Sequence, residues 1–217
     1  MATSSHAQDA AQISVLQKAA EQGDAKAQYN LGLAYSIGKG VKQDQDTAVK
    51  LWRKSADQGY AEAQFNLGIA YHFGQGVKQD EQEANKWYHK AGDQGNAKIQ
   101  DRLGDIYREG NDINKDDKEA AKWWRKGAEQ GDIEAQFSLG AAYSEGRGVK
   151  KDNKEAFKWY SKAAAQGKFL AQYDVGRAYH LGLGVKKDDK EALKWYRKAA
   201  DQNYPPAKKA LALMQKK

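Results

Sequence analysis

A group of carboxylates near the middle of the chain has the spacing of an acid–base site. Asp101, Asp105 and Glu109 follow one another at intervals of four, so on a helix they share one face, where paired carboxylates can act as general acid and base. Arg102 and Arg108 are interspersed with them, and no nucleophile–base arrangement accompanies them. A surface that binds a partner explains these residues better than a catalytic site, and we expect no enzyme activity.

The spacing of the histidines does not indicate a metal site. His72 and His180 are far apart in the chain, and the sequence contains no cysteine and no His-x-x-His pair, which are the ligand patterns of zinc sites. Segments such as Gly74-Gln-Gly76-Val lack the Gly-x-x-x-x-Gly-Lys-[Ser/Thr] pattern of a phosphate-binding loop. We therefore expect neither a metal nor a cofactor.

Aromatic and basic residues alternate in several segments, as they do on surfaces that stack nucleic-acid bases. Trp123 and Trp124 lie between Lys122 and Arg125, and the net charge is +7. However, 36 Lys and Arg are interleaved with 29 Asp and Glu and form no basic block. The tryptophans also recur at fixed intervals, which favours a buried role, so we expect no nucleic-acid partner.

The composition sets limits on the cellular location. No apolar run approaches the roughly 18 residues that a membrane span needs, and we expect no membrane insertion. Ser5, His6 and Ala7 resemble the end of a signal-peptidase site, although no apolar segment precedes them. We expect a periplasmic or exported protein, with the cytoplasm as the alternative and with residues 1–8 as a disordered tail. The oligomeric state stays open.

The elements that position these residues repeat at a fixed interval of 36. A period of this length is typical of stacked copies of one supersecondary unit, each too small to bury its own apolar face. Residues that recur in every copy hold the copies together, and residues that vary between copies are free to recognise a partner. The recurrence is seen at Gly23, Gly59, Gly95, Gly131 and Gly167, and again at Asp44, Asp80, Asp116, Asp152 and Asp188.

Each copy predicts a hairpin of two helices. In the second copy, Ala63, Leu67 and Tyr71 fall on one face of a first helix. Gly68 lies beside that face, and because a glycine within a helix costs about 1 kcal/mol relative to alanine, its recurrence predicts a packing role. Glycines then end the helix, and a second helix with Trp87 on its buried face follows.

Asp80 has the chemistry of the cap that starts this second helix, and Glu83 three residues on predicts a reciprocal capping box. The same Asp-x-x-Glu pair recurs at Asp116, Asp152 and Asp188. We therefore expect an all-α fold, a right-handed α/α superhelical solenoid. It would form a single repeat domain over 9–217, with a capping helix at 9–22, five repeats at 24–202 and a second capping helix at 205–216.

The recurring pattern Ala-x-x-x-Leu-Gly-x-x-Tyr-x-x-Gly-x-Gly-Val-x-x-Asp-x-x-x-Ala-x-x-Trp-x-x-Lys-Ala-Ala-x-x-Gly resembles the Sel-one-like repeat, a relative of the tetratricopeptide repeat. Residues 135–167 and 171–203 follow it closely, and the resemblance covers nearly the whole chain. The third copy departs from it: Ile99 replaces a small alanine, Asp101 replaces Tyr or Phe, and residues 110–113 replace Gly-x-Gly-Val, which predicts a different loop.

The resemblance implies where a partner would bind. In tetratricopeptide-type stacks the first helix of each hairpin lines the inner, concave surface, and its residues opposite the packed face vary between copies here. We call them the first-helix strip, and the alternative for its aromatic rings is packing between hairpins. The strip comprises Lys26, Tyr29, Asn30, Leu33 and Ser36; Glu62, Phe65, Asn66, Ile69 and His72; Lys98, Asp101, Arg102, Asp105 and Arg108; Glu134, Phe137, Ser138, Ala141 and Ser144; and Leu170, Tyr173, Asp174, Arg177 and His180.

The family resemblance also implies a function. Such proteins are adaptors for other proteins, and some are immunity proteins against secreted effectors. We therefore expect a non-enzymatic scaffold that binds a protein or peptide, such as a secreted toxin, along the first-helix strip. The alternatives are an adaptor or regulatory protein of the envelope and a cell-wall or β-lactam hydrolase.

Overall fold

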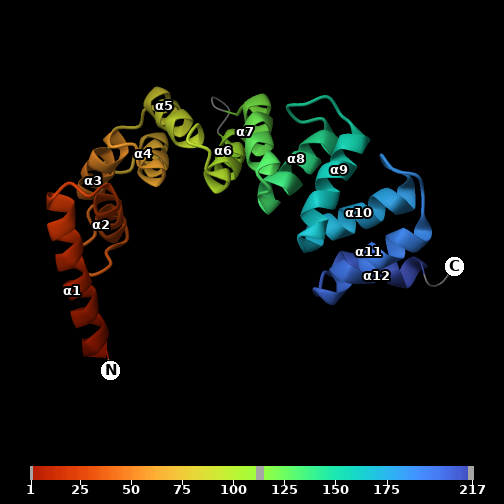
Figure 1. Cartoon of the computed structure of the whole chain (residues 1–217), viewed down its shortest axis with the longest axis horizontal. Helices are drawn as coiled ribbons and strands as arrows, with labels where there is room; N and C mark the ends of the chain where they lie inside the picture. Colours follow the sequence, from red (N-terminus) through yellow and green to blue (C-terminus); the bar gives the residue numbers. More distant parts are fainter. Residues whose placement is uncertain (1, 111–114, 215–217) are drawn as a thin grey trace. The chain divides into compact units, whose positions relative to one another are not determined.

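The protein is all-α. The computed structural model describes residues 2–110 and 115–214, with side chains from residue 11 onwards, and this part of the chain forms twelve helices and no strand (Figure 1). The predicted fold class is therefore confirmed. The helices are α1 (Ala2–Glu21), α2 (Ala25–Ile37), α3 (Gln45–Asp57), α4 (Ala61–Phe73), α5 (Glu81–Gly92), α6 (Ala97–Glu109), α7 (Asp117–Glu129), α8 (Ile133–Glu145), α9 (Asn153–Ala165), α10 (Phe169–Leu181), α11 (Asp189–Asp201) and α12 (Pro205–Met214).

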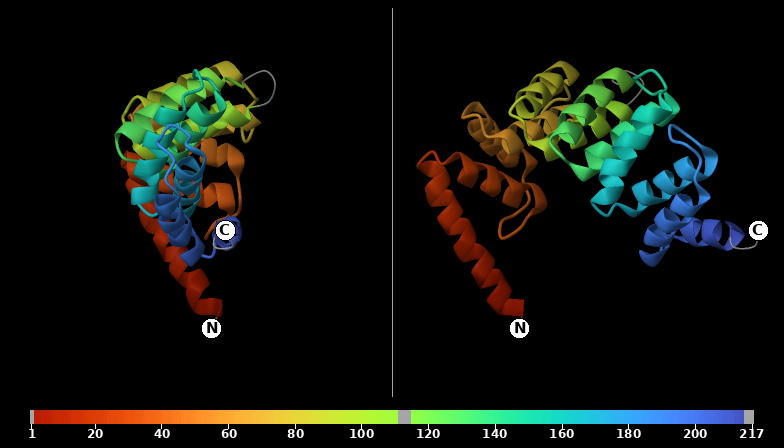
Figure 2. Two further views of the ribbon diagram at one scale, coloured as in Figure 1. Left: turned by 90° about the vertical axis from the view of Figure 1, so that its right-hand side faces the viewer. Right: turned by 45° about the vertical axis from the view of Figure 1, so that its right-hand side comes forward.

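Packing follows the order of the helices along the chain. Two compact units are present, Met1–Ile99 and Gln100–Lys217. In the first unit each helix from α1 to α5 packs on the next, and in the second unit the same holds from α7 to α12 (Figures 1 and 2). The boundary between the two units falls within α6, close to the departures at Ile99 and Asp101.

The ends of the helical array differ in part from the sequence prediction. Helix α1 begins at Ala2, so residues 2–8 are helical where a disordered tail was predicted. This segment contains no Gly or Pro that would stop a helix. Helix α12 stands where the second capping helix was predicted. Residues 111–114, which include most of the loop expected to differ, lie outside the described residues, as do residues 215–217.

A glycine within each first helix receives an aromatic ring from the second helix of the same hairpin. A Cβ atom on Gly140 would lie 2.7 Å from the ring of Tyr160, and one on Gly68 would lie 2.5 Å from the ring of Tyr88. These distances are shorter than a carbon–carbon contact allows, which confirms the predicted packing role. Equivalent contacts join Gly32 to Trp52, Gly104 to Trp124 and Gly176 to Tyr196.

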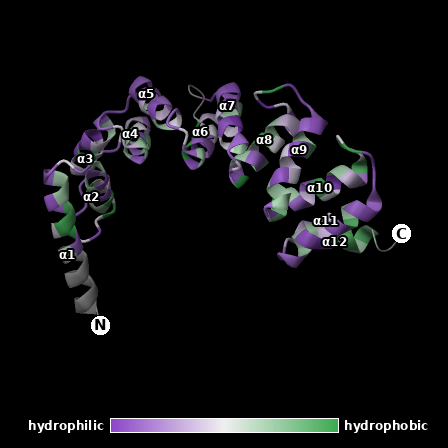
Figure 3. Cartoon of the chain, in the orientation of Figure 1, coloured by the Kyte–Doolittle hydropathy of each residue, from purple (hydrophilic) through white to green (hydrophobic). Residues whose placement is uncertain are grey.

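The tryptophans of the second helices belong to the core. Trp123 is 1% and Trp124 is 2% exposed. The predicted buried role is confirmed for five of the six tryptophans, and Trp195 is half-buried. The Lys126 ammonium lies 4.1 Å from the centroid of the Trp123 ring, a cation–π distance. This contact explains the alternation of tryptophan and lysine on helices such as α5 and α7, where hydrophilic residues predominate (Figure 3).

An aspartate caps each second helix, but the reciprocal capping box does not form. Asp152 Oδ1 accepts hydrogen bonds from the backbone N–H groups of Lys154 and Glu155, at 2.8 and 3.2 Å. Its own N–H donates to the carbonyl of Tyr143 at 3.0 Å. Glu155 instead accepts from the Lys158 ammonium at 3.1 Å. The prediction was wrong in this half, because the loop already satisfies the N–H group that the glutamate would have reached.

The loops that follow α4, α8 and α10 fold back onto the preceding hairpin. Gly146 ends α8 in the left-handed conformation, with φ of 78°. A Cβ atom on Gly148, which has φ of +66°, would lie 1.8 Å from the carbonyl oxygen of Asp117 at the start of α7. Glycine is required there both by the backbone angle and by the close approach of the two chains.

Candidate partner-binding pocket

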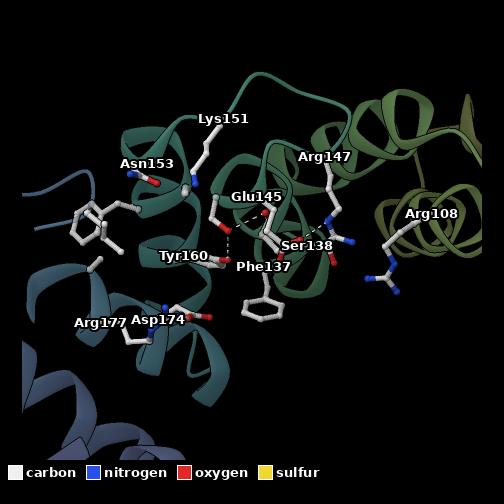
Figure 4. Close-up of a pocket in the computed structure, with 16 residues that line it drawn as sticks. Arg108, Phe137, Ser138, Glu145, Arg147, Lys151, Asn153, Tyr160, Asp174 and Arg177 are labelled. Atoms are coloured by element: carbon white, nitrogen blue, oxygen red, sulfur yellow. Dashed lines mark hydrogen bonds and ion pairs between the residues drawn. The ribbon is translucent and has the colours of Figure 1, made fainter. Parts of the chain in front are cut away.

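Residues of three successive first helices line one pocket in the second unit. The pocket has a volume of about 660 Å³ and is formed by the end of α6, by α8 and α9 with the loop between them, and by α10 with the loop that follows it (Figure 4). We call it the α8 pocket. It contains seven residues of the first-helix strip: Arg108, Phe137, Ser138, Ala141, Ser144, Asp174 and Arg177.

Aromatic rings give the α8 pocket an apolar floor. Phe137 packs against Tyr160 with the ring centroids 5.6 Å apart, and Phe157 packs edge-on against Tyr179 at 5.3 Å. The Tyr160 hydroxyl lies 3.3 Å from Ser144 Oγ, and burial raises the pKa of Tyr160 to about 12. The phenol therefore stays neutral at physiological pH.

Small side chains keep the pocket open. Ala141 and Ser144 of α8 lie one turn apart on the pocket wall. In the second copy the equivalent positions carry Ile69 and His72, and there the phenylalanine ring of the strip, Phe65, is only 2% exposed. The hairpin thus lines a pocket in the copy where these two residues are small, and its phenylalanine is buried in the copy where they are large.

Charged residues surround the rings, and most are already paired. Arg147 Nε lies 2.6 Å from Glu145 Oε2, and Arg177 Nη1 lies 3.1 Å from Asp174 Oδ1. Burial raises the pKa of Asp174, while the Arg177 guanidinium acts in the opposite direction. Lys151 is exposed and makes no ion pair among the described residues.

Arg108 lies on α6 among the carboxylates that the sequence analysis grouped together. Its Nη2 atom lies 3.4 Å from Asp105 Oδ1 and also pairs with Glu109. Burial raises the pKa of Asp105, and the Arg108 guanidinium opposes that rise. These carboxylates therefore act as counter-ions of an arginine that faces the pocket, which agrees with a binding surface.

Asp101 is buried, whereas a residue that contacts a partner would be exposed. It is 8% exposed, and its Oδ1 atom has no hydrogen-bond partner among the described residues. Burial, followed by the nearby carboxylates of Asp105, Asp132 and Glu134, raises its pKa to about 7. Lys168 lowers the pKa, but it is itself paired with Glu134 at 2.5 Å.

The other aromatic residues of the first-helix strip pack within the stack. The Tyr29 ring centroid lies 5.2 Å from that of Tyr60, and the Tyr173 centroid lies 5.5 Å from that of Tyr196 and 5.3 Å from that of Tyr204, so the packing alternative holds for both rings. Both remain half-buried. Phe65 and His72 are buried at 2% and 7% exposure, so, like Asp101, they offer almost no surface to a partner, and this part of the strip prediction needs correction.

The rest of the strip is dispersed over the first helices. In the first unit, Asn30 and Leu33 line a separate pocket of about 360 Å³ between α1 and α2. The remaining residues are half-buried or exposed and line neither pocket: Lys26, Ser36, Glu62, Asn66, Ile69, Lys98, Arg102, Asp105, Glu134, Leu170 and His180. His180 pairs with Asp189 at 2.6 Å. Among the described residues, no three His, Cys, Asp or Glu side chains are grouped so as to hold a metal ion.

The residues at the end of α8 and in the loop after it that line the α8 pocket were missed in the sequence analysis. Glu145, Arg147 and Lys151 reach it because the glycines at 146 and 148 turn the chain back. A signal was present, since the position of Arg147 varies between copies, as the strip does. The buried glutamines were also missed, although they recur every 36 residues. Gln136, for example, donates to the carbonyl of Ala128 at 3.2 Å and joins successive hairpins.

Comparison with protein families identifies the repeat. The Sel1 repeat model matches six segments, residues 16–24, 25–60, 61–96, 99–132, 133–168 and 170–204. The chain is a Sel1 repeat protein. The matches account for every hairpin, and the all-α superhelical repeat fold is that of this family. The Sel1 repeat is in general a non-enzymatic fold for interaction between proteins.

Two solved structures resemble this Sel1 repeat protein over most of its length. A protective antigen of uropathogenic Escherichia coli with an SLR fold is 42% identical with a TM-score of 0.82, and the match covers 93% of this chain and 43% of that chain. A Sel1 repeat protein from Oxalobacter formigenes is 38% identical with a TM-score of 0.68, covering 88% and 76%. The chain therefore spans less than half the length of the first relative.

A more distant match adds nothing to this assignment. An immunity protein from Pseudomonas aeruginosa is 23% identical with a TM-score of 0.49, and the match covers 87% of this chain and 72% of that chain. This resemblance does not bear on the function of the Sel1 repeat protein described here. Comparison with curated protein sequences gave no match. No helix in the described part of the chain combines the length and apolar character of a membrane span.

Proposed function

We propose that this Sel1 repeat protein holds a segment of another protein in the α8 pocket without catalysing a reaction on it. The observation that carries the proposal is that three repeats contribute their variable residues to one pocket, while the positions that pack the hairpins recur. A pocket of about 660 Å³ lies within the range of about 300–1,000 Å³ typical of ligand sites. An aromatic floor with a polar rim is also the usual arrangement of a protein-binding hot spot.

The biological setting of this binding is part of the same proposal. Inhibition of a secreted effector is the role we favour, and it rests on the family resemblance; an adaptor of the envelope is the alternative. We place the protein in the periplasm or outside the cell. The related protein from uropathogenic Escherichia coli is a protective antigen, which supports a location accessible from outside. Cell fractionation tests this location, and recovery only in the cytoplasm would contradict it.

The second copy supplies the variant that tests the pocket. Replacing Ala141 by Ile and Ser144 by His transplants the residues of the second copy, where the equivalent Phe65 is buried, so the hairpin already tolerates them. Ser161→His is the matched control, because it transplants His89 of the second copy to a position of α9 that does not line the pocket.

A random peptide library displayed on phage and selected on the wild-type protein supplies the ligands. We expect the selected peptides to lose at least about 10-fold in affinity for the double variant and to bind the control unchanged, since hot-spot contacts carry most of the binding energy. Circular dichroism and the melting temperature show whether the variants fold. Peptides that bind the folded double variant as tightly as the wild type would contradict the proposal.

A further inference from the structure

We propose that the α8 pocket recognises an acidic segment of its partner, an extended chain with Asp or Glu side chains next to an apolar residue. This inference rests on the proposed function and adds the chemistry of the partner. It follows from the charges of the pocket, the orientation of its arginines and the apolar floor between them.

Positive charge exceeds negative charge in the lining of the pocket. Four cationic side chains line it, from Arg108, Arg147, Lys151 and Arg177, against two carboxylates, from Glu145 and Asp174. In Figure 4, Arg108 and Arg147 lie to one side of Phe137 and Arg177 lies to the other. An acidic side chain on either flank of an apolar anchor therefore meets a guanidinium.

The internal ion pairs orient the arginines and leave donors free. A guanidinium has five N–H donors in a planar fork. In their ion pairs Arg177 uses Nη1 and Arg147 uses Nε, so each retains further N–H groups for a carboxylate of the partner. Holding the guanidinium in place before binding lowers the entropy that association costs. Lys151 adds a cation with no ion pair among the described residues.

The aromatic floor of the α8 pocket fits a polypeptide better than a nucleic acid. The Phe137 ring packs against Tyr160, and the Lys168 ammonium lies 5.1 Å from its centroid, so its faces are not free to stack on a base. Ser138 and Asn153, which also line the pocket, carry groups that can hydrogen-bond to the backbone of an extended peptide. Together these residues fit alternating acidic and apolar side chains.

Defined peptides test the inference directly. The probe is a fluorescent heptapeptide with blocked ends, in which Asp and Glu residues flank a central Phe; its comparison peptides carry Asn and Gln, or Lys and Arg, at the same places. An oligothymidylate of similar length and an Asn/Gln peptide with a free C-terminal carboxylate complete the set. Binding is measured by fluorescence anisotropy at about 50 mM and about 200 mM salt, because attraction between exposed charges weakens as salt is added.

Matched charge variants separate the pocket from the rest of the surface. Arg108→Gln with Arg177→Gln removes two cations of the pocket, and Lys122→Gln with Lys194→Gln removes two exposed cations of the second helices α7 and α11. We expect the acidic peptide to bind at least about 10-fold more tightly than the neutral peptide, and to lose at least about 10-fold in affinity only in the arginine variant.

Several results would overturn the inference. Failure of the acidic peptide to bind refutes the acidic partner, as does an affinity of the neutral peptide or of another probe of the set that matches or exceeds that of the acidic peptide. Equal losses of affinity in the arginine variant and the lysine variant refute it as well. The phage selection keeps the two proposals apart. Selected peptides that need an open pocket but are not enriched in Asp and Glu would sustain the proposed function and refute the acidic partner.

Discussion

Replacing Asp101 by Asn is expected to stabilise the protein above pH 7 and to leave its stability unchanged near pH 4. Asp101 occupies the strip position at which the other copies place Tyr29, Phe65, Phe137 and Tyr173. Its side chain is 8% exposed, and its Oδ1 atom has no hydrogen-bond partner among the described residues. The ionised form is therefore costly, and asparagine has nearly the same shape without the charge.

The size of the effect follows from the pKa. Burial, together with Asp105, Asp132 and Glu134, raises the pKa of Asp101 from 3.8 to about 7. A difference of about 3 pKa units corresponds to up to about 4 kcal/mol at 1.36 kcal/mol per unit. Because the folded protein holds this proton more tightly than the unfolded chain, the wild type loses stability as the pH rises from about 4 to about 7. The loss is complete above pH 7.

Urea unfolding from pH 4 to pH 8 measures this difference. Tryptophan fluorescence follows the unfolding of both units. Four of the six tryptophans lie in the second unit, and among them the Trp124 ring packs against Gly104 one turn from Asp101. The free energy of unfolding of Asp101→Asn minus that of the wild type is expected to rise from near zero to between about 2 and 4 kcal/mol. Asp201→Asn, at an exposed position of α11, is the control. A difference that does not change with pH would refute the reasoning.

Three further substitutions test the packing of the repeat, each by urea unfolding at pH 7. Gly140→Ala is expected to destabilise by about 1–3 kcal/mol, because its Cβ would lie 2.7 Å from the Tyr160 ring; a gain, as helix propensity alone predicts, would contradict this. Gly148→Ala is expected to lower the free energy of unfolding by at least about 2 kcal/mol more than Gly167→Ala. Both glycines have positive φ, but only Gly148 has atoms within 4 Å of the added Cβ. Asp152→Ala is expected to cost about 1 kcal/mol through loss of the cap, and no change would show that the cap is not stabilising.

The period of the sequence predicted the hairpins well, because positions that recur are those that pack. The glycine of each first helix and the aspartate that caps each second helix could be assigned roles from their spacing alone. The role of Glu155 could not, because it depends on whether the loop already satisfies the N–H group of Asp152. It does, through the carbonyl of Tyr143, and spacing within one helix contains no information on that bond.

The pocket was harder to predict than the hairpins, since helix geometry alone does not say how much of a side chain its neighbours cover. Phe65 and Phe137 have the same place in the repeat, and the sequence treats them alike. One is buried and the other lines a pocket. The positions one and two turns further along the helix carry large side chains in the second copy and Ala141 and Ser144 in the fourth.

Exposure of a strip residue is therefore decided by the volumes of its neighbours on the same helix face, and these volumes can be read from the sequence once the register is known. Applied to the fifth copy, the same comparison explains why Tyr173 remains half-buried. Its neighbour at the position of Ala141 is Arg177, a long side chain whose guanidinium pairs with Asp174 at 3.1 Å. The guanidinium thus lies where it can border the α8 pocket, and the ring beneath it is left to pack against Tyr196 and Tyr204.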